Sequence, residues 1–577
     1  MSHPISRRGI LSAGAATLAA CSAPAPEEML SADATRATGA FAHGIASGDP
    51  RADSVILWTR LTPENVNGGP VILTWKMSET TDFATITAQG ATEANVAKNW
   101  AVKVEATGLK AGTQYFYQFS LGDKTSPIGQ TRTLPKGEID SVRFAVVSCS
   151  NWQEGYFNAY DHISRQNGID AVIHLGDYFY EYGASKFEGT EMAKQGHLHE
   201  PRHEVITLED YRIRHAQYRT DPSLQAMSAK FPMIMIWDDH ESSNDSWKTG
   251  AQNHDPETEG PWEDRKQAAM RAYYEWLPIR EPEAGKTREH LFRALDYGDL
   301  LSLVTVETRL TARAEPLIIE NHIDEIGSEE EAEAFKTNVL GDPAREMFGQ
   351  IQEDFIVSSL QASKDAGQTW RVLANQVIMA RLISPDMEPY IGEDAILALE
   401  PSWPNVRDAV SLSKYGFPLY ADSWEGYPAA RERFFNRLDK NGINDIFVLT
   451  GDAHEFWMND LSQDDGKRVG IEVVTTSVSS ETLLKFMGEN TEDYSLLMTQ
   501  ANKDARYYNA MHNGYLDITF TPRHAAVRMM AVSTTKSRDY FASEAASFTV
   551  QPKKESLNIS NPKGLNLKQR ALFNGLG

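Results

Sequence analysis

Four short apolar runs in the chain each end abruptly in a cluster of polar side chains. The runs are Phe144–Val147, Ala171–Ile173, Met233–Ile236 and Ile446–Leu449. Runs this short with no polar residue on either face are typical of buried strands in layered α/β domains. Loops that leave the carboxyl ends of such strands meet at one rim, where ligands bind. The sequence therefore predicts that four distant polar clusters converge on one site.

The four clusters together offer carboxylates, a thiol, a phenol and imidazoles. Carboxylates gathered at one rim repel each other unless a cation lies between them, and a mixed oxygen, nitrogen and sulfur set suits a transition metal beside a harder ion. Taken alone, each motif has an ordinary structural explanation, such as a small core cysteine or a hydrogen-bonded core histidine. Their joint occurrence after four strands predicts a metal site. The clusters are Ser148-Cys149-Ser150-Asn151, Gly176-Asp177-Tyr178-Phe179-Tyr180, Trp237-Asp238-Asp239-His240-Glu241 and Thr450-Gly451-Asp452-Ala453-His454.

The chain of 577 residues is too long for one ordinary domain. From Phe41 to about Pro135 it shows short strand patterns separated by turn residues, which predicts a small β-sandwich. Within it, Leu109–Tyr115 resembles the turn-and-tyrosine pattern of fibronectin-type modules. Two later runs, Leu300–Val306 and Trp370–Leu373, are expected to be further strands of the second domain. The expected division is 1–36 as signal and linker, 37–137 as the β-sandwich, 138–550 as the domain that carries the site, and 551–577 as a loop-like tail.

The amino terminus has the pattern of an export signal. Arg7-Arg8 precedes a mild apolar stretch rich in Ala and Gly, as in twin-arginine signals, and Leu18–Cys21 resembles a lipobox. Cys21 is then a possible lipid anchor, although the Ala- and Pro-rich segment after it also offers ordinary cleavage sites; the alternative is a frayed helix of the mature protein. Since no run of about 20 apolar residues occurs, no transmembrane helix is expected.

The charge balance excludes one class of partner. The sequence has 56 Lys and Arg against 80 Asp and Glu, a net charge of −24. Because phosphate backbones select basic faces, we expect no nucleic-acid-binding surface. Three histidines at 197, 199 and 203 leave open a second metal site, but their loop setting favours a solvated rim. The acidic run Glu329–Glu333 is expected to be a solvated helix face.

The motifs together resemble those of the PhoD-type alkaline phosphatases, within the calcineurin-like metallophosphoesterase superfamily. The resemblance extends from about Phe41 to about residue 550. It implies an α/β (α+β) sandwich of two mixed β-sheets flanked by helices, preceded by the small all-β domain, and an enzyme that hydrolyses phosphate esters outside the cytoplasm. The motifs that carry it are Gly176-Asp177-x-x-Tyr180, Trp237–Glu241, Gly451-Asp452-x-His454, Cys149, Gly44–Pro50, Leu57–Arg60 and Asp422–Pro428.

The resemblance also implies a set of ligands for ferric iron and calcium in a site of two or more metals, with other divalent metals as an alternative. Two positions depart from the family pattern: a single Asn precedes Asp245 where two adjacent Asn are usual, and Glu307-Thr308-Arg309 stands in place of Asp-x-Arg. By the resemblance, Cys149, Tyr180 and His454 hold the iron, Asp177 bridges the metals, Asp239, Asn244 and Asp452 hold calcium, and His240, with Asp239, serves catalysis beside the substrate phosphate.

The implied mechanism is attack on phosphorus by a hydroxide held between the metals, with His240 protonating the leaving oxygen or stabilising the transition state, and with no phosphoenzyme. The sequence does not separate phosphate monoesters from diesters. A phospholipase D-like activity on lipid phosphodiesters remains open, as does a non-catalytic surface protein with structural metals. The natural substrate and the oligomeric state are not predicted.

Overall fold

We describe a computed structural model of the chain over residues 40–63, 69–400, 404–482, 491–554 and 556–565. The predicted export signal at Arg7-Arg8, the lipobox cysteine Cys21 and the linker after it lie outside these residues. Among the described helices, none has both the length and the apolar character needed to cross a bilayer.

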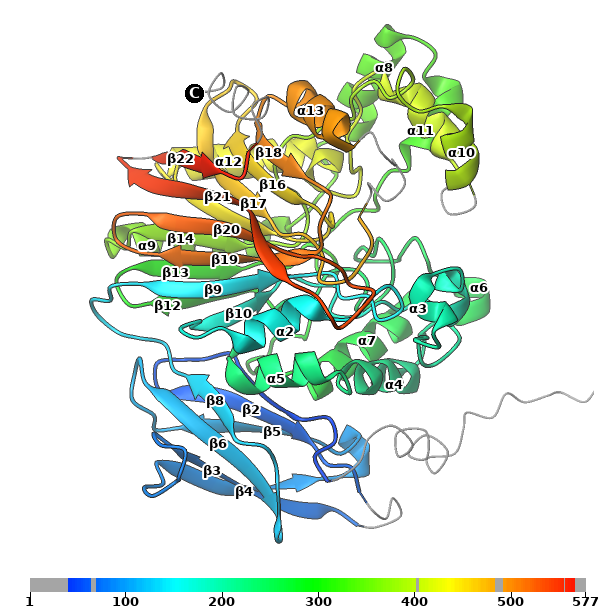
Figure 1. Ribbon diagram of the computed structural model, residues 1–577. Coiled ribbons are helices and arrows are strands. Elements are labelled where there is room, and N and C mark those ends of the chain that lie inside the picture. Colours follow the sequence, from blue (N-terminus) through cyan, green and yellow to red (C-terminus); the bar gives the residue numbers. More distant parts are fainter. Residues whose placement is uncertain (1–39, 64–68, 401–403, 483–490, 555, 566–577) are drawn as a thin grey trace, which may run out of the picture.

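The first part of the chain is all β, as predicted. Tyr115 forms a tyrosine corner of the kind found in sandwich domains. Its buried hydroxyl accepts a hydrogen bond from the backbone N–H of Lys110 at 2.8 Å. One layer is a five-stranded antiparallel sheet, seen at the bottom of Figure 1. Its strands are β4 (Ala88–Ala94), β3 (Val71–Ser78), β6 (Gln114–Leu121), β7 (Lys124–Thr125) and β8 (Gly129–Arg132).

The other layer of this part does not form a separate sheet. Gly48 in β1 pairs in parallel register with Met233 in β11, so three amino-terminal strands extend a ten-stranded sheet of the second part. Its order is β22 (Ser556–Lys563), β21 (Ala542–Lys553), β20 (Ala525–Val532), β19 (Gly514–Phe520), β9 (Val142–Val147), β10 (Ala171–His174), β11 (Met233–Met235), β1 (Ile45–Gly48), β2 (Ser54–Arg60) and β5 (Ala101–Thr107).

A second, seven-stranded sheet packs against the first. Four of its strands, β13, β14, β15 and β17, run parallel, as do β9, β10 and β11 in the first sheet. Both sheets also contain antiparallel pairs, which gives the predicted sandwich of two mixed sheets. The order of the second sheet is β12 (Arg293–Tyr297), β13 (Leu301–Thr305), β14 (Trp370–Ala374), β15 (Ile446–Thr450), β17 (Arg468–Val474), β16 (Phe456–Ser462) and β18 (Ala505–Asn509).

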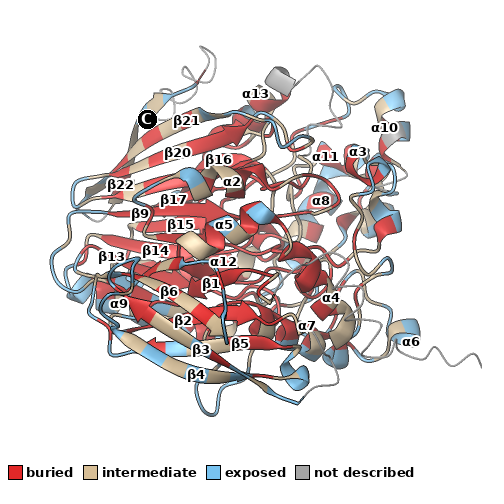
Figure 2. Ribbon diagram, turned by 60° about the horizontal axis from the view of Figure 1, so that its bottom comes forward, coloured by how far each residue is buried: buried red, intermediate tan, exposed pale blue. Residues whose placement is uncertain are grey.

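The apolar runs become strands because both of their faces are buried. In β15, Phe447 and Leu449 enter the core between the sheets, whereas Ile446 and Val448 enter a second core under the outer helices. This alternation of neighbouring residues follows from the two-residue repeat of a strand. Figure 2 shows the strands of both large sheets largely buried. The helices α9 (Gly349–Asp365) and α12 (Pro428–Lys440) pack on this second sheet.

The carboxyl-terminal segment differs from its prediction. We expected a loop-like tail from residue 551, but Ser556–Lys563 forms β22, which pairs with β21 at the edge of the large sheet. An edge strand can leave one face in water, so its sequence is largely polar and resembles that of a loop. The acidic run, in contrast, lies as predicted on α8 (Glu329–Phe335), where Glu329, Glu330 and Glu331 are exposed.

A group of helices stands beyond the carboxyl ends of the parallel strands, at the upper right of Figure 1. It comprises η3 (Ile319–Glu325), α8, α10 (Glu393–Leu399) and α11 (Val406–Ser413). Its small apolar core includes Phe335 and Phe417. We call this group the helical insert.

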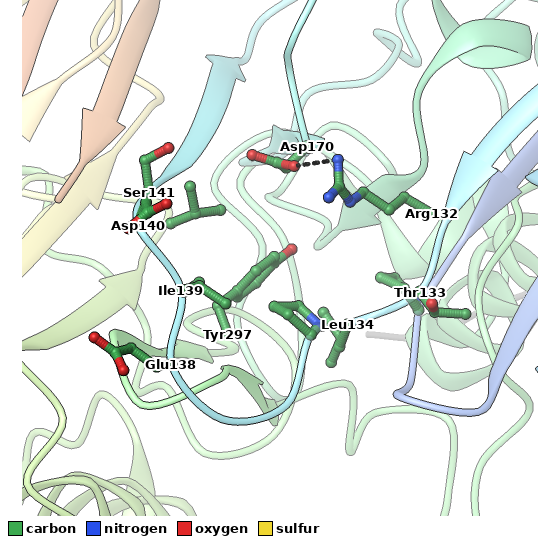
Figure 3. A pocket seen from close by; sticks show the side chains of 12 residues that line it. Arg132, Thr133, Leu134, Glu138, Ile139, Asp140, Ser141, Asp170 and Tyr297 are labelled. Atoms are coloured by element: carbon green, nitrogen blue, oxygen red, sulfur yellow. Dashed lines mark ion pairs between the residues drawn. The ribbon is translucent and has the colours of Figure 1, made fainter. Parts of the chain in front are cut away.

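The link between the two parts of the chain bends around a polar pocket of about 400 Å³ (Figure 3). Arg132 and Asp170 form an ion pair at 3.3 Å on its wall, and Tyr297 lies below them. Val142, which begins β9, also lines it. The pocket therefore lies at the amino ends of the parallel strands, the end opposite the predicted site.

Candidate functional site

The polar clusters predicted to converge do meet in space. Three sets of side chains bring their ligand atoms within 4.8 Å of one another. Asp177 belongs to all three sets, so its carboxylate stands between a sulfur- and nitrogen-rich side and an oxygen-rich side. The sets are Cys149, Asp177 and His454; Asp177, Asp239 and His240; and Asp177, Asp238, Asp239 and Asp452.

Four of these residues adopt a left-handed backbone conformation. The φ angles of Cys149, Asp177, Asp452 and His454 are 60°, 54°, 63° and 59°. Such a conformation costs a non-glycine residue about 1–3 kcal/mol and persists only where the surrounding structure enforces it. The turns are enforced by hydrogen bonds between loops, from Cys149 N–H to Gly176 O at 3.2 Å and from Ser150 N–H to Asp177 O at 2.9 Å.

Gly176 and Glu241 hold two of the loops against each other. Gly176 has a φ of +108°, and a Cβ at this position would lie 2.3 Å from the Cβ of Asp238. Glu241 accepts backbone hydrogen bonds from Asp177 (3.1 Å), Tyr178 (2.5 Å) and Asp238 (2.8 Å). Its buried carboxyl group therefore fixes the loops after β10 and β11 in one arrangement.

The sulfur- and nitrogen-rich side is organised around Tyr180. Its hydroxyl donates to Asp177 Oδ2 at 3.1 Å, lies 2.9 Å from His454 Nε2, and accepts from Ser480 Oγ at 2.8 Å. His454 Nδ1 lies 2.9 Å from the carbonyl oxygen of Glu481. Because a carbonyl only accepts, Nδ1 carries the proton and Nε2 keeps its lone pair toward the cluster.

Cys149 and Tyr180 require a cation to become anionic ligands. Burial, reinforced by the nearby Asp177, raises the pKa of both groups well above their ordinary values. Burial also lowers the pKa of His454 to about 4, so its imidazole stays neutral. Without a cation the thiol and the phenol therefore stay protonated. A bound metal ion displaces their protons and stabilises the thiolate and the phenolate. Thiolate, phenolate and imidazole are ligands suited to a transition metal.

The oxygen-rich side contains buried carboxylate oxygens without hydrogen bonds. Among the described side chains, Asp177 Oδ1, Asp238 Oδ2 and Asp239 Oδ1 are buried and lack any hydrogen-bond partner. Such oxygens are costly to bury unless a cation compensates them. Burial raises the pKa of Asp177 and Asp452 well above the usual range and that of Asp238 to about 6. The donor set and its unmet oxygens therefore fit a hard cation beside the first.

Arg309 is the arginine with the most contacts to the carboxylates named on this side. Its guanidinium is fully buried and contacts four carboxylates, so one cation is shared among several anions. Glu307 accepts backbone hydrogen bonds from Arg309 and Leu310 and thereby shapes the loop. Arg309 Nε bonds Asp238 Oδ1 at 2.5 Å, and its NH groups lie 2.6 Å from Asp422 Oδ2, 3.3 Å from Asp452 Oδ1 and 3.5 Å from Asp239 Oδ1.

His240 forms a buried dyad with Glu181. Its Nδ1 lies 2.7 Å from Glu181 Oε2, and its ring centroid lies 4.1 Å from that of Tyr180. Burial opposes a charge on the imidazole, but Asp239, Glu181 and Asp177 outweigh it and raise the pKa of His240 well above its ordinary value. Because Glu181 holds Nδ1, Nε2 is the ring nitrogen available to the cluster.

The segment after the histidine supports the site through its backbone. Asn244 donates its backbone N–H to Glu181 Oε1 at 2.7 Å and its side-chain amide to Gln252 Oε1 at 2.9 Å. Asp245 donates its N–H to Asp239 Oδ2 at 2.6 Å. These hydrogen bonds fix Glu181 and Asp239; the expected calcium contact of Asn244 stays a prediction.

Each of the three loop histidines contacts a different partner within the protein. His199 is fully buried, with Nδ1 3.1 Å from Tyr182 O, so the expectation of a solvated residue is wrong for it because the loop packs onto the segment that carries Glu181. His197 stacks on Trp152 at 4.2 Å between ring centroids. His203 is largely exposed and pairs with Asp210 at 2.9 Å. The described cluster of metal-ligating side chains does not include them.

A two-sheet sandwich that gathers thiol, phenol, imidazole and carboxylate groups at the carboxyl ends of its strands has the architecture of the metallophosphoesterase class. The chain belongs to the PhoD-like phosphatase family, which it matches over residues 144–529, and residues 25–135 match the N-terminal domain of PhoD-like phosphatases.

Two relatives agree with this assignment. Alkaline phosphatase D of Bacillus subtilis (strain 168) is 34% identical over 502 residues, which are 84% of this chain and 76% of that protein. A solved structure of PhoD has a TM-score of 0.72 and 29% identity, covering 93% of this chain and 97% of that chain. The predicted family and fold are thus confirmed, and the protein is a phosphoric ester hydrolase.

Proposed function

We propose that this enzyme is an exported, metal-dependent phosphoesterase that hydrolyses phosphate monoesters and diesters outside the cytoplasm. The observation that carries the proposal is Asp177, whose carboxylate is shared by three converging sets of donor groups. A carboxylate in this position suits a bridge between two unlike cations. The Arg7-Arg8 pair supports export, and Cys21 is the residue through which a lipid anchor would attach.

The donor types assign the two cation sites. Cys149, Tyr180 and His454 are assigned to ferric iron, since anionic sulfur and phenolate donors favour the ferric state. Asp239 and Asp452, with Asn244, are assigned to calcium, which prefers hard oxygens. When bound, the two ions supply Lewis-acid chemistry: they make hydroxide available near neutral pH and offset the charge of the phosphate.

The protein's own groups provide the proton and fix the charge balance. His240, protonated through its dyad with Glu181, delivers a proton from Nε2 to the leaving oxygen. Arg309 keeps Asp238, Asp239 and Asp452 from repelling each other as the substrate phosphate enters. We propose that water, and not a protein side chain, is the nucleophile, so that no covalent phosphoenzyme forms.

Metal analysis with an absorbance spectrum tests the proposal. The purified protein should contain iron and calcium and absorb visible light, and Tyr180→Phe should shift or abolish that band. Removal of both metals by a chelator should abolish hydrolysis of 4-nitrophenyl phosphate and of bis(4-nitrophenyl) phosphate, and their relative rates separate monoesterase from diesterase. His203→Ala, in the exposed loop, is the control and should change neither colour nor rate. Full hydrolysis by metal-free protein would contradict the proposal.

A further inference from the structure

An apolar pocket of about 290 Å³ opens in the helical insert. It lies between η3, α11 and the segment 417–420, and Tyr494 of α13 (Thr491–Ala501) completes its wall. The side chains of Ile319, Val410, Leu412 and Phe417 that line it are each at most 7% exposed. Its volume is just below the range of about 300–1,000 Å³ that is usual for sites of small organic ligands.

Three polar side chains on the pocket wall already have hydrogen-bond partners. Ser413 Oγ donates to Val410 O at 2.6 Å and accepts from Met387 N–H at 2.8 Å. Ser384 Oγ donates to Pro385 O at 3.2 Å. Tyr420 donates its hydroxyl to Glu455 Oε2 at 3.0 Å. Apart from the Glu320 carboxyl group, a ligand in the pocket therefore meets mainly hydrocarbon surface.

One short segment of the chain links the pocket wall to the residues around the metal-ligand cluster. Tyr420 lines the pocket, and Asp422, two residues later, bonds Arg309 at 2.6 Å. Two residues span at most about 7 Å. Arg309 in turn contacts Asp452, and the Glu455 that holds Tyr420 directly follows His454 in the chain. This link is the basis on which we treat a phosphate at the cluster and a hydrocarbon group in the pocket as parts of one ester.

We propose that this pocket binds the apolar alkyl or aryl group of a phosphodiester whose phosphate lies at the cluster, which makes the enzyme selective for diesters with one short hydrocarbon substituent. The inference rests on the phosphoesterase function proposed above. The small volume fits a chain of several carbons or a single ring. The carboxyl group of Glu320 on the wall disfavours anionic amphiphiles.

A homologous series of 4-nitrophenyl alkyl phosphates tests this selectivity. We expect kcat/KM to rise roughly fourfold per added methylene from methyl to about hexyl, since each buried methylene contributes to binding, and then to level off when the pocket is full. Ala409→Phe, which adds a ring from α11 into the pocket, should flatten the series and leave the methyl ester rate unchanged. Ala395→Phe on α10 is the matched control: it is similarly half-buried, does not line the pocket, and should keep the slope.

The outcomes separate the two proposals. A flat series in the unmodified enzyme, or an unchanged slope in a folded Ala409→Phe variant, would overturn the pocket assignment while hydrolysis of the methyl ester upholds the phosphoesterase. No hydrolysis of any member by metal-loaded enzyme would overturn the phosphoesterase proposal and this inference with it. Thermal unfolding of both variants confirms that they are folded.

Discussion

At the scale of single residues, the chemistry of the site depends on neighbours of the predicted ligands. His240 keeps its proton because Glu181 binds Nδ1 at 2.7 Å and Asp239 and Asp177 lie nearby. Glu181 is itself fixed by the backbone N–H of Asn244. Glu181 is therefore a positioning residue: it sets the orientation and charge of the histidine without touching the reacting atoms.

We expect Glu181→Gln to lower kcat by about 10- to 100-fold, the usual effect of removing such a supporting partner, while iron and calcium contents stay unchanged. Without the carboxylate the pKa of His240 falls, so the alkaline limb of the pH–rate profile should move to lower pH. Steady-state kinetics across pH, with metal analysis, check both effects. Glu353→Gln removes an equally buried carboxylate from α9 and should leave the profile in place. An unshifted alkaline limb in Glu181→Gln would show that the dyad does not set this proton.

The converging ligand types were predictable, and their supporting groups were not. Four of the predicted ligands lie in the polar clusters that follow the apolar runs, so their position after a strand identifies them: Cys149, Asp177, Asp239 and His454. Asp238 and Glu181 flank those motifs, but nothing in the sequence separates them from solvated neighbours. Three supporting groups lie far from the strand-end motifs. Arg309 belongs to a segment that departs from the family pattern, and Asp422 belongs to a segment that resembles the family. Nothing in the sequence marks Ser480 as part of the site.

At the scale of elements, the closeness of two loops decides whether the site forms. The loops after β10 and β11 touch at Gly176 and Asp238, where a Cβ would meet another at 2.3 Å. We expect Gly176→Ala to destabilise the fold by at least about 1–3 kcal/mol, the cost of its positive φ alone, and to weaken metal retention. Urea unfolding and metal analysis measure the two effects. Gly189→Ala is the control, since a Cβ there meets nothing within 4 Å; equal stability of the two variants would refute this role.

The strands themselves were largely predictable from the sequence because burial on both faces leaves an uninterrupted apolar run, as in β9 and β15. Two features were not. The edge strand β22 is polar on its exposed face and therefore reads as a tail. The continuity of the two parts rests on the pairing of Gly48 with Met233, a long-range contact that local patterns do not encode.

At the scale of the whole molecule, acidity and cation binding are linked. The chain carries a net charge of −24, yet within the site the buried Arg309 faces four carboxylates, of which one, Asp422, also pairs with Arg313. The balance has to come from bound cations or from protons. In the absence of metal, burial raises the pKa of Glu241 and Asp245 to about 8 each and that of Asp238 to about 6.

These shifts fix how the stability of metal-free protein depends on pH. Unfolded carboxyl groups titrate near pH 4, whereas buried histidines such as His174 and His215, whose pKa burial lowers to about 3, titrate near pH 6.5 once unfolded. Above about pH 7 these histidines are neutral in both states, so from there to about pH 8 the carboxyl groups make the folded state bind more protons than the unfolded state, and the free energy of unfolding falls as pH rises. We expect the Tm of chelator-treated protein to be lower at pH 8 than at pH 7, and added calcium and iron to raise Tm more at pH 8, where fewer protons compete for the ligands. Differential scanning fluorimetry measures both. Asp245→Asn should reduce the slope, whereas Glu353→Gln should keep it. A metal-free Tm that is flat or rises over this range would mean that the buried acids are neutralised by something other than protons and metals.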